Sequence, residues 1–321
     1  MPQLPAFVGR HVVHIQDLSV EDMQTVLAVA ERMADRVQKG GSLDLARGRV
    51  LANLFFEPST RTRLSFESAM SRLGGQTLTI SEAASTSLAK GETLQDTIRM
   101  VASYADAIVL RHPREGAARL AAEASPVPVL NAGDGAGQHP TQTLLDLFTI
   151  QRTKGPVGDQ RIALLGDLKY GRTVHSLANA LARFGAQLVF VAPPALQLPK
   201  ETEAELAKLG ARIERERDPE AVIADADVLY VTRIQKERFP DLEEYRRVAG
   251  TYRVTADLVA KGKKGLVVLH PLPRVGEIDP EVDRMPAAKY FEQAANGVPV
   301  RMALLSLVLG LESYGAQGAH P

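Results

Sequence analysis

The sequence predicts an α/β fold made of two doubly wound domains, each built on a parallel sheet. Short runs rich in Val, Ile and Leu alternate with segments that carry apolar residues at helical spacing. The runs lack an alternating polar face, as expected for strands that helices cover on both sides. The pattern restarts near residue 160, and a length of 321 residues suits two domains.

The first half of the chain alternates expected strands with expected helices. The expected strands are the apolar runs Val50–Phe56, Gln76–Ile80, Ala107–Leu110 and Val127–Leu130. The expected helices, which show apolar residues at helical spacing, are Val20–Val37, Thr60–Leu73 and Thr93–Ser103. The pair Gly74 and Gly75 ends the second of these helices.

The polar segment 151–160, QRTKGPVGDQ, is typical of a connection between domains. Beyond it, the expected strands are Ile162–Leu165, Leu188–Val191, Val228–Val231 and Val267–Leu269, and the expected helices are Arg172–Phe184 and Ala294–Leu309. We therefore expect one domain over residues 1–150 and a second over residues 151–293. Spacing alone leaves open on which of them the last helix packs.

The composition excludes several classes of protein. Lys plus Arg and Asp plus Glu each number 38, so the basic excess typical of proteins that bind nucleic acid or anionic membranes is missing. Aromatic residues make up 5% and Trp is absent, which argues against stacking on single-stranded nucleic acid. The absence of Cys removes disulfides, thiolate nucleophiles and Cys-metal sites, and it fits a reducing cytoplasm.

No segment of the sequence has the features of a targeting or membrane element. The N-terminus, Met1–Arg10, lacks an apolar core of signal-peptide length. The longest apolar runs, such as Leu304–Leu309, are far shorter than a bilayer span. We therefore expect a cytoplasmic protein that is not bound to a membrane.

The first chemical signal lies where the first strand meets its helix. The segment Glu57–Arg63 reads EPSTRTR, so Ser59 or Thr60 would cap the helix and Arg61 would lie in its first turn. A helix N-terminus attracts anions and disfavours cations, so Arg residues there indicate a bound anion or a compensating acid. The alternative is an ordinary capped helix with solvated Arg side chains. Neither Gly-rich nucleotide-binding pattern follows the first strand of either domain.

Cationic residues recur at the carboxyl ends of the expected strands, where ligands bind in open α/β sheets. Six such ends carry Arg61, Arg111, His139, Arg172, Arg233 and Arg274. One Arg on a loop is an ordinary surface charge, but the joint pattern predicts a cationic cleft between the two domains. His11 and His14 have no third ligand near them in sequence, and His175 lies on a helix face, so we expect no metal site.

Several segments together resemble the transcarbamoylase family. The resemblance is carried by Ser59–Arg63, Arg111–Pro113, His139–Gln142, Gly166–Ser176, Arg233–Arg238 and His270–Arg274, and by Ser87–Glu92, which is similar to the family's mobile loop. It spans about residues 8–310. Relatives that act on ornithine typically read His-Cys-Leu-Pro where this chain reads His270–Pro273. That difference, together with Arg233 and Gln235, favours a dicarboxylic amino acid as acceptor.

The resemblance implies transfer of a carbamoyl group from carbamoyl phosphate to L-aspartate, giving N-carbamoyl-L-aspartate and phosphate, the committed step of pyrimidine synthesis. It implies a carbamoyl-phosphate-binding domain over residues 1–150, onto which the C-terminal helix 294–310 packs back, and an aspartate-binding domain over residues 151–293. It also implies a homotrimer with shared active sites. No covalent intermediate, metal or organic cofactor is needed. A regulatory or dihydroorotase-like chain remains open as a further partner.

The resemblance also implies roles for individual residues. The implied carbamoyl phosphate ligands are Ser59, Thr60, Arg61, Thr62, Arg111, His139, Gln142, Pro271 and Leu272, and Arg61, Thr62, Arg111 and His139 are the implied catalytic residues. The implied aspartate ligands are Lys90, Arg172, Arg233, Gln235 and Leu272, with Ser87 and Lys90 supplied by the neighbouring subunit. Glu57 would hold the cleft closed by pairing with Arg172 and Arg238; the alternative is a local pair with Arg61 or Arg63.

Three other functions compete with this interpretation. The first is carbamoyl transfer to a different amino acid, such as ornithine. The second is a dinucleotide-dependent oxidoreductase, which the doubly wound pattern suggests but the missing G-x-G-x-x-G motif opposes. The third is a non-catalytic assembly subunit, which the intact set of Ser59, Arg61, Arg111, His139 and Arg233 opposes.

Overall fold

The structure is a computed structural model that describes residues 7–40, 43–81, 90–135, 137–234, 241, 243, 245–246 and 252–311, with only the backbone of Arg172. The chain forms two compact units. Unit 1 comprises Met1–Leu144 and Asn296–Pro321, and unit 2 comprises Leu145–Ala295. The chain thus leaves unit 1 inside a helix, after Leu144 rather than after residue 150, and it returns just before its last described helix.

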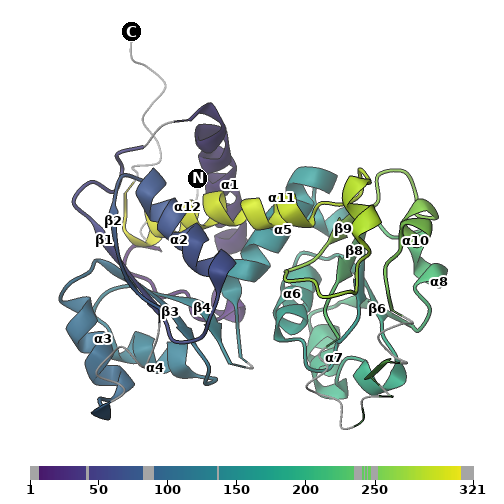
Figure 1. The fold of residues 1–321 in the computed structure, drawn as a ribbon, viewed down its shortest axis with the longest axis horizontal. Coiled ribbons are helices and arrows are strands. Elements are labelled where there is room, and N and C mark those ends of the chain that lie inside the picture. Colours follow the sequence, from purple (N-terminus) through teal and green to yellow (C-terminus); the bar gives the residue numbers. More distant parts are fainter. Residues whose placement is uncertain are drawn as a thin grey trace. The chain divides into compact units, whose positions relative to one another are not determined.

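Unit 1 is a three-layer arrangement around a parallel sheet of order β2-β1-β3-β4. Its strands are β1 (Val50–Phe55), β2 (Gln76–Ile80), β3 (Ala107–His112) and β4 (Val129–Asp134). Its helices are α1 (Val20–Lys39), α2 (Thr60–Arg72), α3 (Leu94–Ala102), α4 (Ala117–Ala124), the start of α5 (Pro140–Lys154) and α12 (Gly297–Val308). Helices α1, α2 and α12 pack together on one face, and α3 and α4 cover the other (Figure 1).

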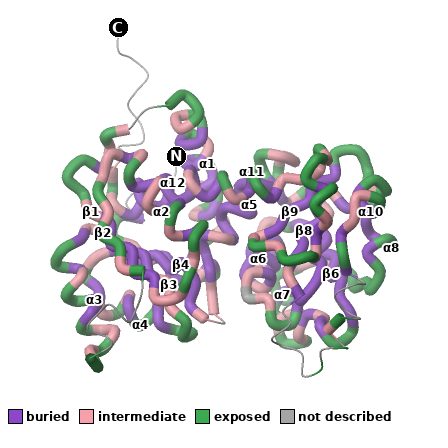
Figure 2. The backbone as a smooth tube through the Cα atoms, viewed as in Figure 1, coloured by how far each residue is buried: buried purple, intermediate pink, exposed green. Residues whose placement is uncertain are grey.

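The core of unit 1 follows from the strand sequences. On one face, Leu54 and Leu110 pack against Ile98 of α3 and Ala121 of α4, and all four are buried. Figure 2 shows buried backbone along β3 and β4, as expected for central apolar strands with helices on both sides.

Helix α12 is buried at every position except Val298. A helix that is apolar on all sides must be surrounded by protein. It packs against α1 and α2, so this C-terminal segment belongs to unit 1 although it is far from it in sequence.

Unit 2 is built on a parallel sheet of order β7-β6-β5-β8-β9. Its strands are β5 (Arg161–Leu165), β6 (Gln187–Val191), β7 (Arg212–Glu216), β8 (Val228–Val231) and β9 (Val267–Leu269). Its helices are the remainder of α5, α6 (Arg172–Arg183), α7 (Lys200–Lys208), α8 (Glu220–Ile223), α10 (Ala256–Ala260) and α11 (Tyr290–Ala295). Helix α6 packs on β6 and on α7, and α11 packs on β9. The predicted α/β class with two parallel sheets is confirmed.

Some elements differ from the sequence expectation for physical reasons. Strand β7 reads RIERE and is mostly exposed at the sheet edge, so it has no apolar run to reveal it. Strand β3 continues to His112 and β4 to Asp134, because pairing with neighbouring strands carries the extended backbone into polar residues. Within the described helices, none is long and apolar enough to cross a bilayer.

Candidate functional site

The N-terminus of α2 presents polar groups without acidic residues in its first turn. Ser59 is the N-cap residue, with φ −160° and ψ 102°, yet its side chain makes no capping hydrogen bond. Thr62 is buried, and the Ser65 hydroxyl turns back to donate toward the Arg61 carbonyl oxygen at 2.7 Å. The cap hydroxyl and the positive end of the helix dipole are therefore left for an anionic ligand.

Arg61 and Arg111 bring two positive charges to this helix end. Partial burial, and the charge of Arg111 next to it, lower the pKa of Arg61. Among the described residues, no carboxylate forms an ion pair with Arg61. Adjacent guanidinium groups repel each other unless an anion lies between or beside them, so the pair favours a bound anion.

Arg111 is held in place from two sides. Its Nη1 donates to the Ala132 carbonyl oxygen at 2.9 Å, and its Nη2 donates to Glu57 Oε1 at 3.0 Å. Its side chain is only 11% exposed. An Arg fixed by a backbone carbonyl and a carboxylate is preorganised, and so it loses little entropy when it binds a ligand.

Gly133 allows Arg111 and His139 to approach the end of β4. Its φ is +114°, and a Cβ atom there would lie 2.7 Å from Arg111 Nη1 and 3.6 Å from His139 Cδ2. A side chain at this position would push the guanidinium away. The sequence analysis did not single out Gly133; the signal was its place in the Gly-rich segment that follows a strand.

His139 lies buried just before α5. Its Nδ1 is 3.5 Å from Thr141 Oγ1, and Arg301 Nη2 of α12 donates to the same hydroxyl at 3.3 Å. The Thr141 hydroxyl thus links the His139 ring to Arg301, and it donates to Nδ1 or accepts from it according to the tautomer of the ring. The Gln142 backbone N–H donates to the His139 carbonyl oxygen at 3.0 Å.

Asp134 organises the turn that leads to His139. Its Oδ1 accepts from the Gln138 backbone N–H at 2.8 Å and from Asn131 Nδ2 at 3.1 Å, and its Oδ2 accepts from the Gly116 N–H at 3.0 Å. The carboxylate is almost fully buried. Sequence reasoning missed this residue, because its partners come from β4, the following turn and the start of α4.

Glu57 has a partner in unit 1 that the sequence analysis did not name, whereas its expected partners, the side chains of Arg172 and Arg238, lie outside the described residues. It forms its ion pair with Arg111, and neither local alternative, Arg61 or Arg63, is its partner. Strand pairing is the reason: Phe55 of β1 is paired with Arg111 of β3, so Glu57, two residues after the end of β1, lies near the Arg111 side chain. The second carboxylate oxygen, Oε2, is buried without a hydrogen-bond partner among the described atoms and can still accept from another cation.

In unit 2, the loop after β9 is tightly constrained. His270 Nδ1 accepts from the Leu272 N–H at 2.8 Å, so its Nε2 carries the proton that it donates to Glu277 Oε1 at 2.7 Å. Leu272 has φ +55°, in the left-handed region that a bulky residue rarely adopts, and the Leu272–Pro273 peptide bond is cis. A positive φ at a bulky residue is typical of loops that form ligand sites. Pro271 and Leu272 are half-buried.

Burial alone would raise the pKa of Glu277, but hydrogen bonds outweigh it. The bond from His270 and the Val275 N–H, which donates to Oε2 at 2.9 Å, favour the charged carboxylate. The pKa of Glu277 is therefore lowered. Glu277 is thus an ionised anchor for the loop at neutral pH.

The turn after β5 is shaped by close backbone packing. Gly166 has φ +121°, and a Cβ atom there would lie 2.4 Å from the Thr232 carbonyl oxygen at the end of β8. The Asp167 Oδ1 accepts from the Tyr170 N–H at 2.9 Å, and His175 Nε2 lies 2.8 Å from the Leu168 carbonyl oxygen. This turn places Arg172 at the first residue of α6.

The remaining predicted site residues are only partly covered by the structure. Arg233 is half-buried directly after β8, and Lys90 is exposed. Three predicted residues, Ser87, Gln235 and Arg238, lie outside the described residues, and so does the side chain of Arg172. Unit 1 thus brings together Glu57, Arg61, Arg111 and His139, and unit 2 holds Pro271 and Leu272 on one loop.

The expectation that Arg274 offers a charge to the cleft needs correction. Its Nη2 donates to Asp283 Oδ2 at 2.5 Å, and its guanidinium lies 5.2 Å from the ring centroid of Tyr290. The hydrogen bond from Arg274 lowers the pKa of Asp283. The charge is therefore neutralised inside unit 2, by partners that sequence spacing did not reveal.

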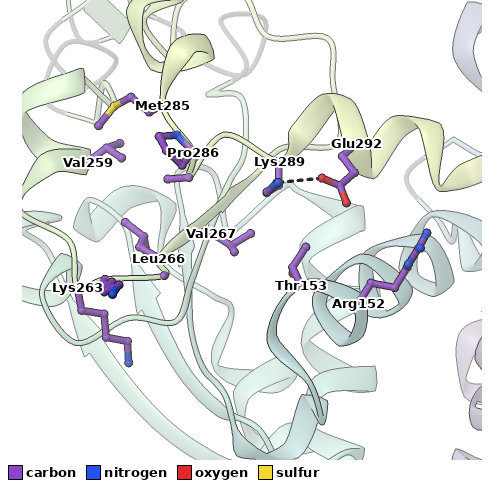
Figure 3. A pocket seen from close by; sticks show the side chains of 13 residues that line it. Arg152, Thr153, Val259, Lys263, Leu266, Val267, Met285, Pro286, Lys289 and Glu292 are labelled. Carbon is purple, nitrogen blue, oxygen red and sulfur yellow. Dashed lines mark ion pairs between the residues drawn. The ribbon is translucent and has the colours of Figure 1, made fainter.

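A surface pocket of about 600 Å³ in unit 2 includes none of the predicted site residues. It lies between the C-terminal half of α5, β9 and the segment 285–292 (Figure 3). Lys289 pairs with Glu292 at 3.0 Å, and Lys263, another lining residue, pairs with Asp227 at 2.8 Å. Much of its positive charge is thus already neutralised by neighbouring acids.

The described residues contain no group of three His, Cys, Asp or Glu side chains placed to hold a metal ion. His11, one of two histidines near the N-terminus, accepts at Nδ1 from the Val129 N–H at 3.1 Å. It therefore fixes the start of β4.

The structure thus has a two-unit α/β architecture with a candidate anion site at a helix N-terminus. Two protein-family models match the chain. The carbamoyl-P binding domain of aspartate/ornithine carbamoyltransferases matches residues 10–152. The Asp/Orn binding domain of the same family matches residues 158–308. The chain therefore belongs to the aspartate/ornithine carbamoyltransferase family.

Similar proteins narrow the comparison within this family. The aspartate carbamoyltransferase catalytic subunit of Thermococcus onnurineus is 58% identical over 303 residues, which cover 94% of this chain and 98% of that protein. The catalytic subunit of M. jannaschii aspartate transcarbamoylase matches with a TM-score of 0.89 and 51% identity, covering 93% of this chain and 97% of that one. The Trypanosoma cruzi aspartate transcarbamoylase, solved with carbamoyl phosphate and aspartate, matches with a TM-score of 0.90 and 41% identity. The match covers 96% of this chain and 99% of that one.

Proposed function

We propose that the chain catalyses transfer of the carbamoyl group of carbamoyl phosphate to L-aspartate, yielding N-carbamoyl-L-aspartate and phosphate. The observation that carries this proposal is the placement of Arg61 beside Arg111 at the N-terminus of α2, with His139 close by across Gly133. Two guanidinium groups at a helix N-terminus form a site for a phosphate dianion. The similarity to aspartate carbamoyltransferase catalytic subunits supports the same activity.

Unit 1 binds carbamoyl phosphate in this proposal. The phosphate is held by Ser59, Thr60, Arg61, Thr62 and Arg111 at the start of α2. The carbamoyl oxygen accepts from Arg111, His139 and Thr62, which stabilise the negative charge that develops on it, as an oxyanion hole does. The buried His139 ring, which contacts the Thr141 hydroxyl through Nδ1, is placed for this donor role.

Unit 2 supplies most of the aspartate ligands and completes the carbamoyl site together with Gln142 of unit 1, and Lys90 of unit 1 comes from the neighbouring subunit. The carbamoyl NH2 group donates to Gln142 and to backbone carbonyls of Pro271 and Leu272, and aspartate binds at Leu272. The aspartate carboxylates bind Lys90, Arg172, Arg233 and Gln235. The deprotonated α-amine attacks the carbonyl carbon, a tetrahedral intermediate forms, and phosphate leaves. Catalysis comes from positioning and charge stabilisation, with no covalent enzyme intermediate.

The assembly belongs to the same proposal. The carbamoyl-phosphate-binding domain and the aspartate-binding domain both supply active-site residues, and Glu57 serves domain closure together with Arg172 and Arg238. The unpartnered, buried Oε2 of Glu57 supports a second cation there. The chain forms a cytoplasmic homotrimer in which Ser87 and Lys90 come from the neighbouring subunit, and it serves pyrimidine synthesis.

The direct test is an assay of the purified chain with radiolabelled carbamoyl phosphate and a panel of amino acids. We expect a carbamoylated product with L-aspartate and release of one phosphate per product. A carbamoylated product with ornithine in place of aspartate would support the alternative acceptor. No product with any amino acid would overturn the proposed function.

A further inference from the structure

A chain of buried hydrogen bonds ends on the loop 270–277 of unit 2. Tyr230 O–H donates to Asp146 Oδ2 at 2.8 Å, and Gln293 Nε2 donates to Asp146 Oδ1 at 2.7 Å. Gln293 Oε1 then accepts from the His270 backbone N–H at 2.8 Å. All four residues are at most 2% exposed, and they come from α5, β8, α11 and the end of β9.

The carboxylate of Asp146 determines how the Gln293 amide is oriented. An ionised carboxylate can only accept hydrogen bonds, so the NH2 group of Gln293 must face it. The amide oxygen of Gln293 is thereby directed at the N–H of His270. Along this series of hydrogen bonds, each donor therefore has a defined acceptor. A buried network of this kind specifies a single arrangement of its side chains.

The loop requires such an anchor, because its backbone is strained. Leu272 has φ +55°, a left-handed conformation that is unfavourable for a bulky residue and persists only where its surroundings hold it. It is held by its N–H bond to His270 Nδ1, so the position of His270 decides the position of Leu272. Gln293 in turn fixes the N–H of His270 from the core side.

We propose that Asp146 and Gln293 are positioning residues that set the backbone of the loop from His270 to Leu272, and thereby aim the carbonyl groups that receive the carbamoyl NH2 group. The inference rests on the proposed function. It goes beyond that function, since neither residue touches substrate and both act through His270.

A purely structural role explains this network poorly. Burying a carboxylate costs several kcal/mol, and apolar side chains of similar shape are often as stable. What a buried carboxylate supplies is a fixed orientation for its donors. The titratable groups around the network are Tyr230, His270 and Glu277. Burial and the adjacent Asp146 raise the pKa of Tyr230 well above its ordinary value, so its phenol stays a donor.

The test exchanges the two functional groups. Gln293→Glu places two carboxylates opposite each other, and they stay hydrogen-bonded only while they share a proton. As the pH rises, this shared proton is lost, and the two charged carboxylates then repel each other. Adding Asp146→Asn restores the hydrogen bond between positions 146 and 293 with the donor and acceptor exchanged. The amide at position 146 then donates to the carboxylate at position 293, which still accepts from the His270 N–H.

We expect Gln293→Glu to raise KM for carbamoyl phosphate at least ~10-fold between about pH 6 and pH 9, beyond any change in the wild type. The double variant Asp146→Asn/Gln293→Glu should return the pH profile to that of the wild type. Binding of inorganic phosphate, which unit 1 holds, should be unchanged in both variants. Melting temperatures, measured at each pH, identify loss of folding.

Gln160→Glu is the matched control. Gln160 is buried in unit 2, and its side-chain amide donates to the Lys154 and Pro156 carbonyl oxygens, so its substitution should lower stability without a pH-dependent KM. A Gln293→Glu profile equal to that of the wild type, or a double variant that is not rescued, would overturn the positioning role alone. Absence of carbamoyl transfer by the wild-type chain would overturn the proposed function as well.

Discussion

Single residues decide how much positive charge the site in unit 1 gathers. Arg61 and Arg111 are close enough for each to disfavour the charge of the other, and Glu57 neutralises only Arg111. A phosphate dianion relieves that repulsion. Because binding of an anion relieves the repulsion between the two guanidinium groups, the site favours anionic ligands.

Arg61→Ala tests this residue directly. We expect kcat to fall ~10³-fold, because the variant loses a charged donor that stabilises the transition state. The wild-type melting temperature should rise with added phosphate, and that rise should shrink in the variant. Arg63→Ala, two residues further along α2, is the control. Near-normal turnover of Arg61→Ala would contradict the assignment.

Gly133→Ala tests the close approach at the end of β4. Its Cβ atom would displace the Arg111 guanidinium, and we expect kcat to fall by ~10–100-fold. Gly155→Ala has the matched backbone conformation, with φ +85°, but open space around it. The control should lose stability only. Equal kinetics for the two variants would show that crowding at Gly133 has no consequence for Arg111.

At the scale of elements, ordered loops depend on anchors from other parts of the fold. The loop after β9 is held by Glu277 from its far end and by Gln293 of α11 from its near end. The turn before α5 is held in the same way by Asp134. These three anchors are carboxylates or amides that accept from backbone N–H groups, which satisfies donors that no strand or helix pairing reaches.

The Glu277 anchor predicts a pH-dependent stability. Its pKa is lowered in the folded state, so it stabilises the fold above the unfolded value of 4.5 and loses that contribution as the pH falls through the folded value. Glu277→Gln should lower the urea midpoint at neutral pH by an amount equivalent to ~1–2 kcal/mol. The difference from wild type should shrink as the pH falls below 4.5 and through the lower folded-state pKa. A difference that persists in acid, or that Glu281→Gln on the surface reproduces, would contradict this account.

At the scale of the whole molecule, the proposed activity needs residues from both units and from a second subunit. Arg61 belongs to the α2 site, whereas Lys90 is assigned to the neighbouring chain. In the proposed homotrimer, a mixture of two inactive variants contains a native site, in which one chain supplies Arg61 and the next supplies Lys90.

Mixing tests this arrangement. Arg61→Ala and Lys90→Ala trimers should each be nearly inactive, and dissociation and reassembly of the mixture should restore activity, with one native site in each mixed trimer. Native mass spectrometry checks that mixed trimers have formed. Mixed trimers without restored activity would show that each site is built from one chain.

Much of the architecture was predictable because it depends on local periodicity. The apolar runs that become β1, β5 and β8 are visible within a few residues, and so is the helix that begins at Thr60. The polar edge strand β7 was not, since its five residues carry no apolar run and are defined by pairing with β6.

The sequence by itself determined the α/β class, the two parallel sheets and the motifs that place the chain in its family, because these depend on spacing along the chain. Only the tertiary structure decided that Glu57 pairs with Arg111, that Arg274 is neutralised by Asp283, and that α12 packs on α1 and α2. These contacts join residues from separate elements, and they depend on strand order and register. Local patterns contain no information about either.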